Sequence, residues 1–260
     1  MQHAKQLSLV QEIALRGAAW ALVGGIFGFL FVLLLEFVRS FVDPPSAFAL
    51  AAIGGAALTA LFYGSMRLTV LVANFTFVAM LGYVWQGGTP LVIEPLVFVG
   101  AGIGLVVGAL YGLKDKRSRV FCAEAKIIAG AVSGILGGGL AAGLAWLLPA
   151  VPVSVVAMLV APVSVLAYVR LSGWFISRCQ HFLPPFVDGA IVGLGVGSVT
   201  GLLFLIMAGT LDPKLLAGEE LRAFVGRFET AWGLTVLGCA LVCFPVGAVR
   251  AWLGIPWYDK

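Results

Sequence analysis

The sequence predicts an all-α integral membrane protein, a polytopic bundle of about eight transmembrane helices with both termini in the cytoplasm. Hydrophobic residues make up 61% of the 260 residues and charged residues only 11%, against about 45–50% and about 25% in soluble domains. The apolar runs are mostly about 17–25 residues long, the length of a helix that crosses roughly 30 Å of hydrocarbon. The ten-residue alternating segments of a β-barrel are absent from the sequence.

The first expected span covers residues 17–40. It is too long for a secretory signal and lacks the small-residue cleavage site, and Glu36 and Arg39 close it as charges close a membrane span. The preceding residues 1–16 carry apolar side chains at roughly helical spacing. We therefore expect residues 1–16 to form a short amphipathic helix on the membrane surface.

Charges and turn residues divide the rest of the chain. Pro44 and Pro45 end the first span, Arg67 marks a tight turn, and Pro149 and Pro152 separate the fifth span from the sixth. Because eight is an even number, both termini are expected on one side of the membrane. The expected spans are 17–40, 46–66, 68–85, 95–113, 127–148, 153–169, 189–209 and 230–250.

The distribution of basic residues predicts which side that is. With a cytoplasmic N-terminus, the inside segments hold all but four of the 16 lysines and arginines, whereas the 12 acidic residues show little bias. Lysine and arginine set membrane orientation, so this asymmetry favours cytoplasmic termini. The four basic residues expected outside are Arg39, Lys214, Arg222 and Arg227.

Glycine recurs at every fourth position in three of the expected spans. This spacing leaves a bare groove along one side of a helix, which lets two backbones approach closely in lipid. We interpret the grooves as helix-packing or partner interfaces, and packing inside one bundle and docking of another subunit both stay open. The glycines are Gly100, Gly104, Gly108 and Gly112, then Gly130, Gly134 and Gly138, and then Gly189, Gly193, Gly197 and Gly201.

The span at 127–148 has more small surface than one contact needs. It also contains Gly137, Gly139 and Gly143. We expect part of this surface to face another membrane subunit or a second copy of the chain.

The densest charge cluster lies between the fourth and fifth expected spans. It contains Lys114, Lys116, Arg117 and Arg119, and its first role is to orient the protein. Anionic lipid headgroups are an additional expected ligand, because each cation near such a surface contributes about 1 kcal/mol.

No charged residue lies in the middle of an expected span, which removes most of the support for ion-coupled transport. Asn74 is the one strongly polar residue near the centre of a span. We expect its side chain to form an interhelical hydrogen bond, and contact with a substrate at the midplane is the alternative.

The sequence predicts no cofactor, no metal site and no catalytic group. The only histidines, His3 and His181, cannot supply the pair of ligands that a haem within the bilayer needs. A metal shared by Cys122, Cys179 and His181 would require loops to converge by chance. Asp188 beside His181 is the nearest approach to an acid–base pair.

The longest segment expected outside the membrane is 210–229. Its leucine, valine and phenylalanine residues recur at helical intervals beside acidic residues and an arginine. We expect an amphipathic segment on the extracytoplasmic surface. No soluble module is attached, so residues 1–260 are predicted to form a single transmembrane domain.

These features favour a non-catalytic subunit or scaffold of a larger membrane protein complex, packed through glycine-rich helix faces. The alternative is a channel or carrier for a small, largely uncharged solute or lipid, which flexible glycine helices permit. The expected partners are the lipid bilayer and other membrane subunits or further copies of the chain, and not nucleic acid. Short loops and the charge bias favour the bacterial inner membrane.

Overall fold

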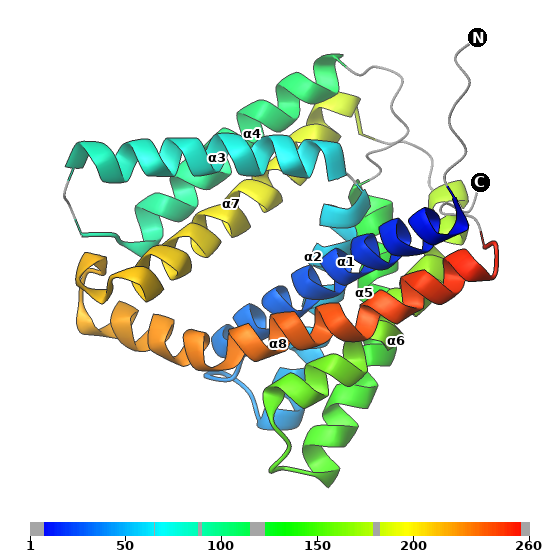
Figure 1. The fold of residues 1–260 in the computed structure, drawn as a ribbon. Helices are drawn as coiled ribbons and strands as arrows, with labels where there is room; N and C mark the ends of the chain where they lie inside the picture. Colours follow the sequence, from blue (N-terminus) through cyan, green and yellow to red (C-terminus); the bar gives the residue numbers. More distant parts are fainter. Residues whose placement is uncertain (1–7, 65, 88–89, 115–122, 179–182, 256–260) are drawn as a thin grey trace. The chain divides into compact units, whose positions relative to one another are not determined.

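A computed structural model describes residues 8–64, 66–87, 90–114, 123–178 and 183–255 (Figure 1). The predicted all-α class is confirmed, and in these ranges eight α-helices are long and apolar enough to cross a membrane. The chain is therefore an integral membrane protein. The elements are α1 (Leu9–Val38), α2 (Pro44–Gly64), α3 (Met66–Gly87), α4 (Ile93–Lys114), α5 (Ala123–Leu147), α6 (Val153–Arg178), α7 (Pro185–Leu211), the 3-10 helix η1 (Pro213–Leu215) and α8 (Glu219–Trp252).

Helix α1 begins earlier than the sequence predicts. Ser8 and Gln11 form a capping box, in which each side chain bonds the backbone N–H of the other residue. From Leu9 the helix runs without a break to Val38, because no proline interrupts it. Residues 9–16 are thus the first turns of α1 instead of a separate surface helix, and residues 1–7 lie outside the described part of the chain.

Helix α2 begins at a side-chain cap. The Asp43 carboxylate accepts a hydrogen bond from the backbone N–H of Ser46 at 3.2 Å, and Pro44 occupies the start of the helix, where no N–H donor is needed. The hydrogen bonds from the side chain and backbone of Ser46 hold the pKa of Asp43 below its ordinary value of 3.8. The ionised carboxylate therefore favours the folded start of α2.

We expect replacement of Asp43 by alanine to lower stability slightly at neutral pH. Because the folded pKa is lower than the unfolded one, the contribution of the carboxylate is complete well above pH 3.8 and is lost as the pH falls below it. The midpoint of unfolding, measured from pH 7 to pH 2 for wild type and Asp43→Ala, checks this. Asp43→Asn keeps a capping oxygen without the charge. A gap between wild type and Asp43→Ala that stays constant over the whole range would contradict the assignment.

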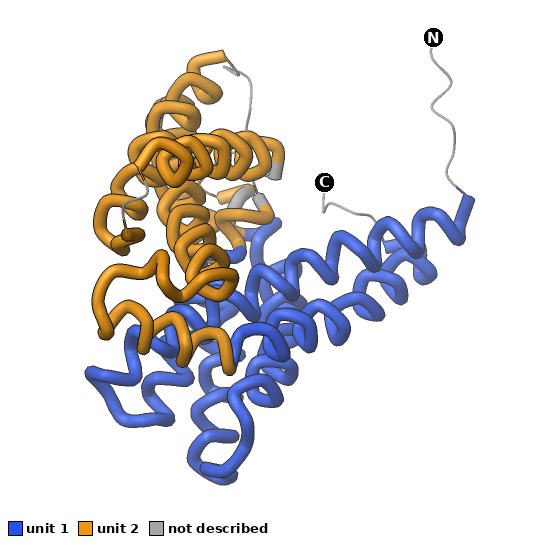
Figure 2. Tube along the Cα trace, turned by 60° about the vertical axis from the view of Figure 1, so that its left-hand side comes forward, with its two compact units in different colours: residues 1–59, 130–174, 231–260 blue, residues 60–129, 175–230 orange. Residues whose placement is uncertain are grey.

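The chain divides into two compact units, each built from segments that are distant in sequence (Figure 2). Unit 1 contains residues 1–59, 130–174 and 231–260, and unit 2 contains residues 60–129 and 175–230. The units are described separately below.

Unit 2 is centred on α3, α4 and α7, which pack against one another. At one end of these helices lies a cluster of buried apolar side chains, within which the rings of Phe77 and Phe204 meet edge to face at 5.5 Å. The segment before α4 and the end of η1 with the residues after it close this end. The N–H of Leu91 donates to the carbonyl of Leu215, and the N–H of Ala217 donates to the carbonyl of Leu91. The fully or largely buried members are Met80, Leu91, Leu96, Phe204, Leu205, Leu216, Leu221 and Val225.

The segment 210–229, which the sequence predicts to be amphipathic, is not one continuous element. It divides into the end of α7, η1, a turn at Gly218 with φ of +76°, and the first turns of α8. The left-handed backbone at Gly218 is one that a side chain would oppose. Leu216, Leu221 and Val225 face the apolar cluster of unit 2. These apolar residues of the segment therefore pack against other parts of unit 2.

Unit 1 contains a closed circuit of helix contacts, and a glycine lies in each of them. Helix α1 contacts α2 at Gly54, and α2 contacts α5 at Gly134. Helix α5 contacts α6 at Gly137, α6 contacts α8 at Gly238, and α8 returns to α1 at Gly24. Since each glycine lacks a side chain, neighbouring helices in this unit approach closely at these points.

Candidate functional site: glycine-lined helix interfaces

The most extensive helix pair in unit 2 is the antiparallel pair α4 and α7, and its contact surface is made of glycine. Gly100 lies against Gly197, Gly104 against Gly193, and Gly108 against Gly189. The glycines of the two rows thus lie opposite one another along the whole helix pair. At the ends, Gly112 meets Pro185 and Phe186, and Gly201 meets the backbone of Leu96.

This register brings main chain against main chain. A methyl group in place of the α-hydrogen of Gly104 would lie 3.1 Å from the Cα of Gly197 and would overlap the carbonyl of Gly193. Each glycine Cα therefore lies beside a carbonyl oxygen of the other helix, an arrangement that allows weak Cα–H···O contacts of about 0.5–1 kcal/mol each. No side chain stands between the backbones to move aside for a larger residue.

The third glycine row, on α5, faces α2 in unit 1. Gly134 lies against Ile53 and Ala56, and Gly138 lies against Ala49. Gly130 is buried, and its carbonyl accepts a hydrogen bond from Ser133 at 2.7 Å. The structure therefore places this row against an alanine-rich surface and not against a second glycine row.

Helix α5 also has a small-residue face that no other described part of the chain covers. Gly139 and Gly143 are one turn apart, and neither would bring a methyl group within 4 Å of any other described part of the chain. Leu136 and Leu140 flank them and are exposed. We call these four residues the open α5 face.

Helices α1 and α8 form a second close pair, in unit 1, that the sequence signalled only weakly. A methyl group at Gly24 would lie 2.7 Å from both Cβ and Sγ of Cys243 and would overlap the carbonyl of Cys239. Gly28 faces Cys239 and the carbonyl of Thr235. Both cysteines are buried free thiols. The four-residue spacing of Gly24 and Gly28 was the sequence feature that could have predicted this contact. It is a weak feature because the row contains only two glycines.

Comparison of the chain with protein-family models, with curated proteins and with solved structures finds no match.

Of the other predicted site residues, the structure describes Asn74 and Lys114. Asn74 lies on the exposed face of α3, and its amide donates to the carbonyl of Val70 in the same helix at 2.9 Å. The predicted interhelical bond is therefore replaced by an intrahelical one. Lys114 is exposed at the end of α4. Lys116, Arg117 and Arg119 lie outside the described ranges, as do His3, Cys122, Cys179 and His181.

A group of charged residues that sequence reasoning did not assemble lies in unit 2. Asp188, in the first turn of α7, is buried and accepts a hydrogen bond from the backbone N–H of Ala123 at 2.8 Å. Glu124 and the buried Lys126 are close enough to act electrostatically on Asp188. Asp188 thus supplies the first turn of α5 with an acceptor from another helix. The sequence could not show this, because 65 positions separate the two residues.

We expect Asp188→Ala to destabilise the protein by about 1–3 kcal/mol, since it leaves the Ala123 N–H without its acceptor and removes a negative charge near Lys126. Asp188→Asn retains an acceptor oxygen and is expected to cost less. Titration with a denaturing detergent ranks the stabilities of wild type, Asp188→Ala and Asp188→Asn. The loss of helix is followed by circular dichroism. Equal stability of Asp188→Ala and wild type would exclude this role for Asp188.

Proposed function

We propose that this chain is a non-catalytic, membrane-embedded subunit or scaffold that binds a partner transmembrane helix through the open α5 face. The observation that carries the proposal is the contrast between the glycine rows. The rows on α4 and α7 are covered by each other, and Gly134 and Gly138 are covered by α2, whereas Gly139 and Gly143 have no neighbour among the described residues.

The chemistry of this face suits a helix from another membrane protein or from a second copy of the chain. Two glycines one turn apart allow close backbone approach, and exposed Leu136 beside them supplies van der Waals contact. Lipid chains fill such a groove poorly, because small residues present little surface to them. A partner helix gains packing that lipid does not supply.

Site-specific photocrosslinking in native membranes tests the proposal. A photoreactive amino acid at Leu136 is expected to give a discrete crosslinked band. The same amino acid at Val106, an exposed position of α4 on unit 2, serves as the matched control. Adding Gly139→Leu and Gly143→Leu is expected to abolish the band at Leu136. A protein that migrates as a monomer and gives no band at Leu136, or equal bands at both positions, contradicts the proposal.

A channel or carrier for a small, largely uncharged solute or lipid remains the second candidate, and two buried hydroxyl groups favour it. The Oγ1 atom of Thr76 in unit 2 and the Oγ atom of Ser164 in unit 1 are buried without a hydrogen-bond partner in the described structure. Such groups are ready to bind water or a polar solute. Flux into reconstituted vesicles that exceeds flux into empty vesicles, and that falls in Thr76→Val or Ser164→Ala, would favour transport over scaffolding.

A further inference from the structure

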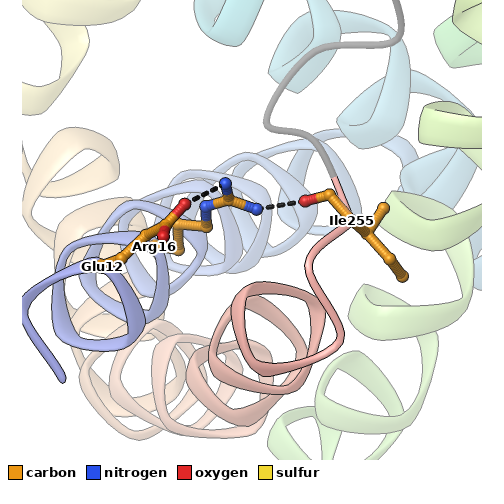
Figure 3. A network of polar contacts seen from close by, with 3 residues as sticks. All are labelled: Glu12, Arg16 and Ile255. Carbon is orange, nitrogen blue, oxygen red and sulfur yellow. Dashed lines mark hydrogen bonds and ion pairs between the residues drawn. The ribbon is translucent and has the colours of Figure 1, made fainter. Parts of the chain in front are cut away.

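The paired ends of α1 and α8 in unit 1 carry a polar network that the proposed function does not use. The backbone carbonyl of Arg16 and the ring of Trp20 lie against Gly247, which joins the first turns of α1 to the last turns of α8. Figure 3 shows the Arg16 guanidinium donating to the Glu12 carboxylate and to the backbone carbonyl of Ile255, just after α8. The charge of Arg16 is therefore balanced within α1.

Arg250 differs from Arg16 in its charge balance. Its guanidinium carbon lies 5.4 Å from the centroid of the Trp20 ring, which is itself only 7% exposed. The ring holds the cation by its π face. No carboxylate of the described residues forms an ion pair with Arg250. This end of unit 1 thus presents a positioned cation with no ion-paired carboxylate among the described residues.

The position of this end along α1 places it at the level of lipid headgroups. At the other end of α1, Glu36 pairs with Arg39 at 2.7 Å and marks one boundary of the hydrocarbon. Arg16 lies 20 residues before Glu36 in the same helix, which is about 30 Å at about 1.5 Å per residue and equals the thickness of the hydrocarbon layer. The turns before Arg16 therefore extend beyond the hydrocarbon.

The surface around these turns is apolar despite that position. Leucine, valine and tryptophan side chains from both helices are at least half exposed there, and water would solvate them poorly. Exposed apolar side chains beside an arginine and a tryptophan are typical of a surface that lies in the interfacial layer of a membrane. The exposed residues are Leu9, Val10, Leu15, Val249, Trp252 and Leu253.

We propose that the paired ends of α1 and α8 bind an anionic phospholipid, with the headgroup phosphodiester against Arg250 and the exposed apolar side chains of this end lying in the interfacial layer around the headgroup. No carboxylate in the part of the chain that the structure describes forms an ion pair with Arg250, and an anionic headgroup supplies a counter-ion. The apolar surface selects a lipid over a soluble phosphate.

Melting of the purified full chain in detergent, at increasing mole fractions of phosphatidylglycerol or of phosphatidylcholine with the same acyl chains, tests the site. Wild type is expected to melt at higher temperature with phosphatidylglycerol than with phosphatidylcholine. Arg250→Gln is expected to raise the apparent dissociation constant for phosphatidylglycerol about fivefold, the equivalent of about 1 kcal/mol for one cation. Arg250→Lys keeps the charge and is expected to lose less.

The matched control is Arg222→Gln, which makes the same charge change at an exposed position near the other end of α8. It is expected to behave as wild type. Equal binding by Arg250→Gln and wild type, an equal effect of phosphatidylcholine, or displacement of the lipid by inorganic phosphate overturns the site. If Arg250→Gln does not fold, wild-type binding must weaken as sodium chloride increases, and binding that is insensitive to salt overturns the proposal.

Discussion

Replacing Gly104 by alanine destabilises the protein by about 3 kcal/mol or more, the largest effect that we expect from a single methyl group in this chain. The added methyl group overlaps the carbonyl of Gly193 and comes within 3.1 Å of the Cα of Gly197. All of these atoms belong to the backbone of α7, so no rotamer change relieves the overlap. Helices α4 and α7 must separate, and the contacts along the whole pair weaken together.

Gly102→Ala is the matched control for this prediction. It adds the same methyl group to the same helix two residues away, where no described atom outside the neighbouring backbone of α4 lies within 4 Å of it. Because alanine is the better helix former, this change is expected to be neutral or to stabilise by up to about 1 kcal/mol. The midpoints of detergent-induced unfolding compare the two variants. Similar midpoints for Gly102→Ala and Gly104→Ala would show that α4 does not meet α7 through its glycine row.

Replacing Gly24 by alanine has the second largest expected effect, a loss of about 2–3 kcal/mol in unit 1. The methyl group overlaps the Cys239 carbonyl and lies 2.7 Å from the Sγ of Cys243. One of these atoms is a side-chain atom that can shift slightly, so we expect a smaller loss than at Gly104.

The neighbouring residue supplies the control. At Gly25 the nearest atom to an added methyl group is Cγ1 of Val236 at 3.7 Å, which is an ordinary van der Waals contact. Gly25→Ala is therefore expected to leave stability unchanged. A thermal melt of the two variants in the same detergent measures the difference, and a loss in Gly25→Ala as large as that in Gly24→Ala would contradict the α1–α8 packing described here.

The sequence predicted the number of helices because membrane spans depend on local properties. A run of about 20 apolar residues and the charges at its ends are visible without knowledge of the fold. The starts of α1 and α8 were predicted less accurately than the number of helices. Ser8 caps α1 and Gly218 precedes α8 well before the apolar runs begin, since a helix can continue into the headgroup layer for as long as no residue breaks it.

The sequence could not predict which helix each glycine row contacts. Periodicity shows that Gly104 and Gly193 each lie in a groove, but it does not say which grooves meet. Gly134 has the same spacing, and it lies against Ile53 and Ala56 instead of another glycine row. Partner choice depends on how the loops and the remaining helices arrange the bundle.

The segment 210–229 shows a related limit. A helical apolar pattern predicts one buried face, but it does not distinguish burial in lipid from burial in protein. The deciding partners of Leu216 and Leu221 are Met80, Leu91 and Leu96, which lie more than 100 residues earlier in the chain.

The central claim is that α4 and α7 cohere through direct contact between their backbones, and solid-state NMR in lipid bilayers measures this directly. With glycine labelled by carbon-13 at Cα and at the carbonyl carbon, the structure predicts cross-peaks between Gly104 and Gly193 and between Gly108 and Gly189. Spectra that contain correlations between glycines of the same helix, but none between the glycines of α4 and those of α7, would contradict the claim.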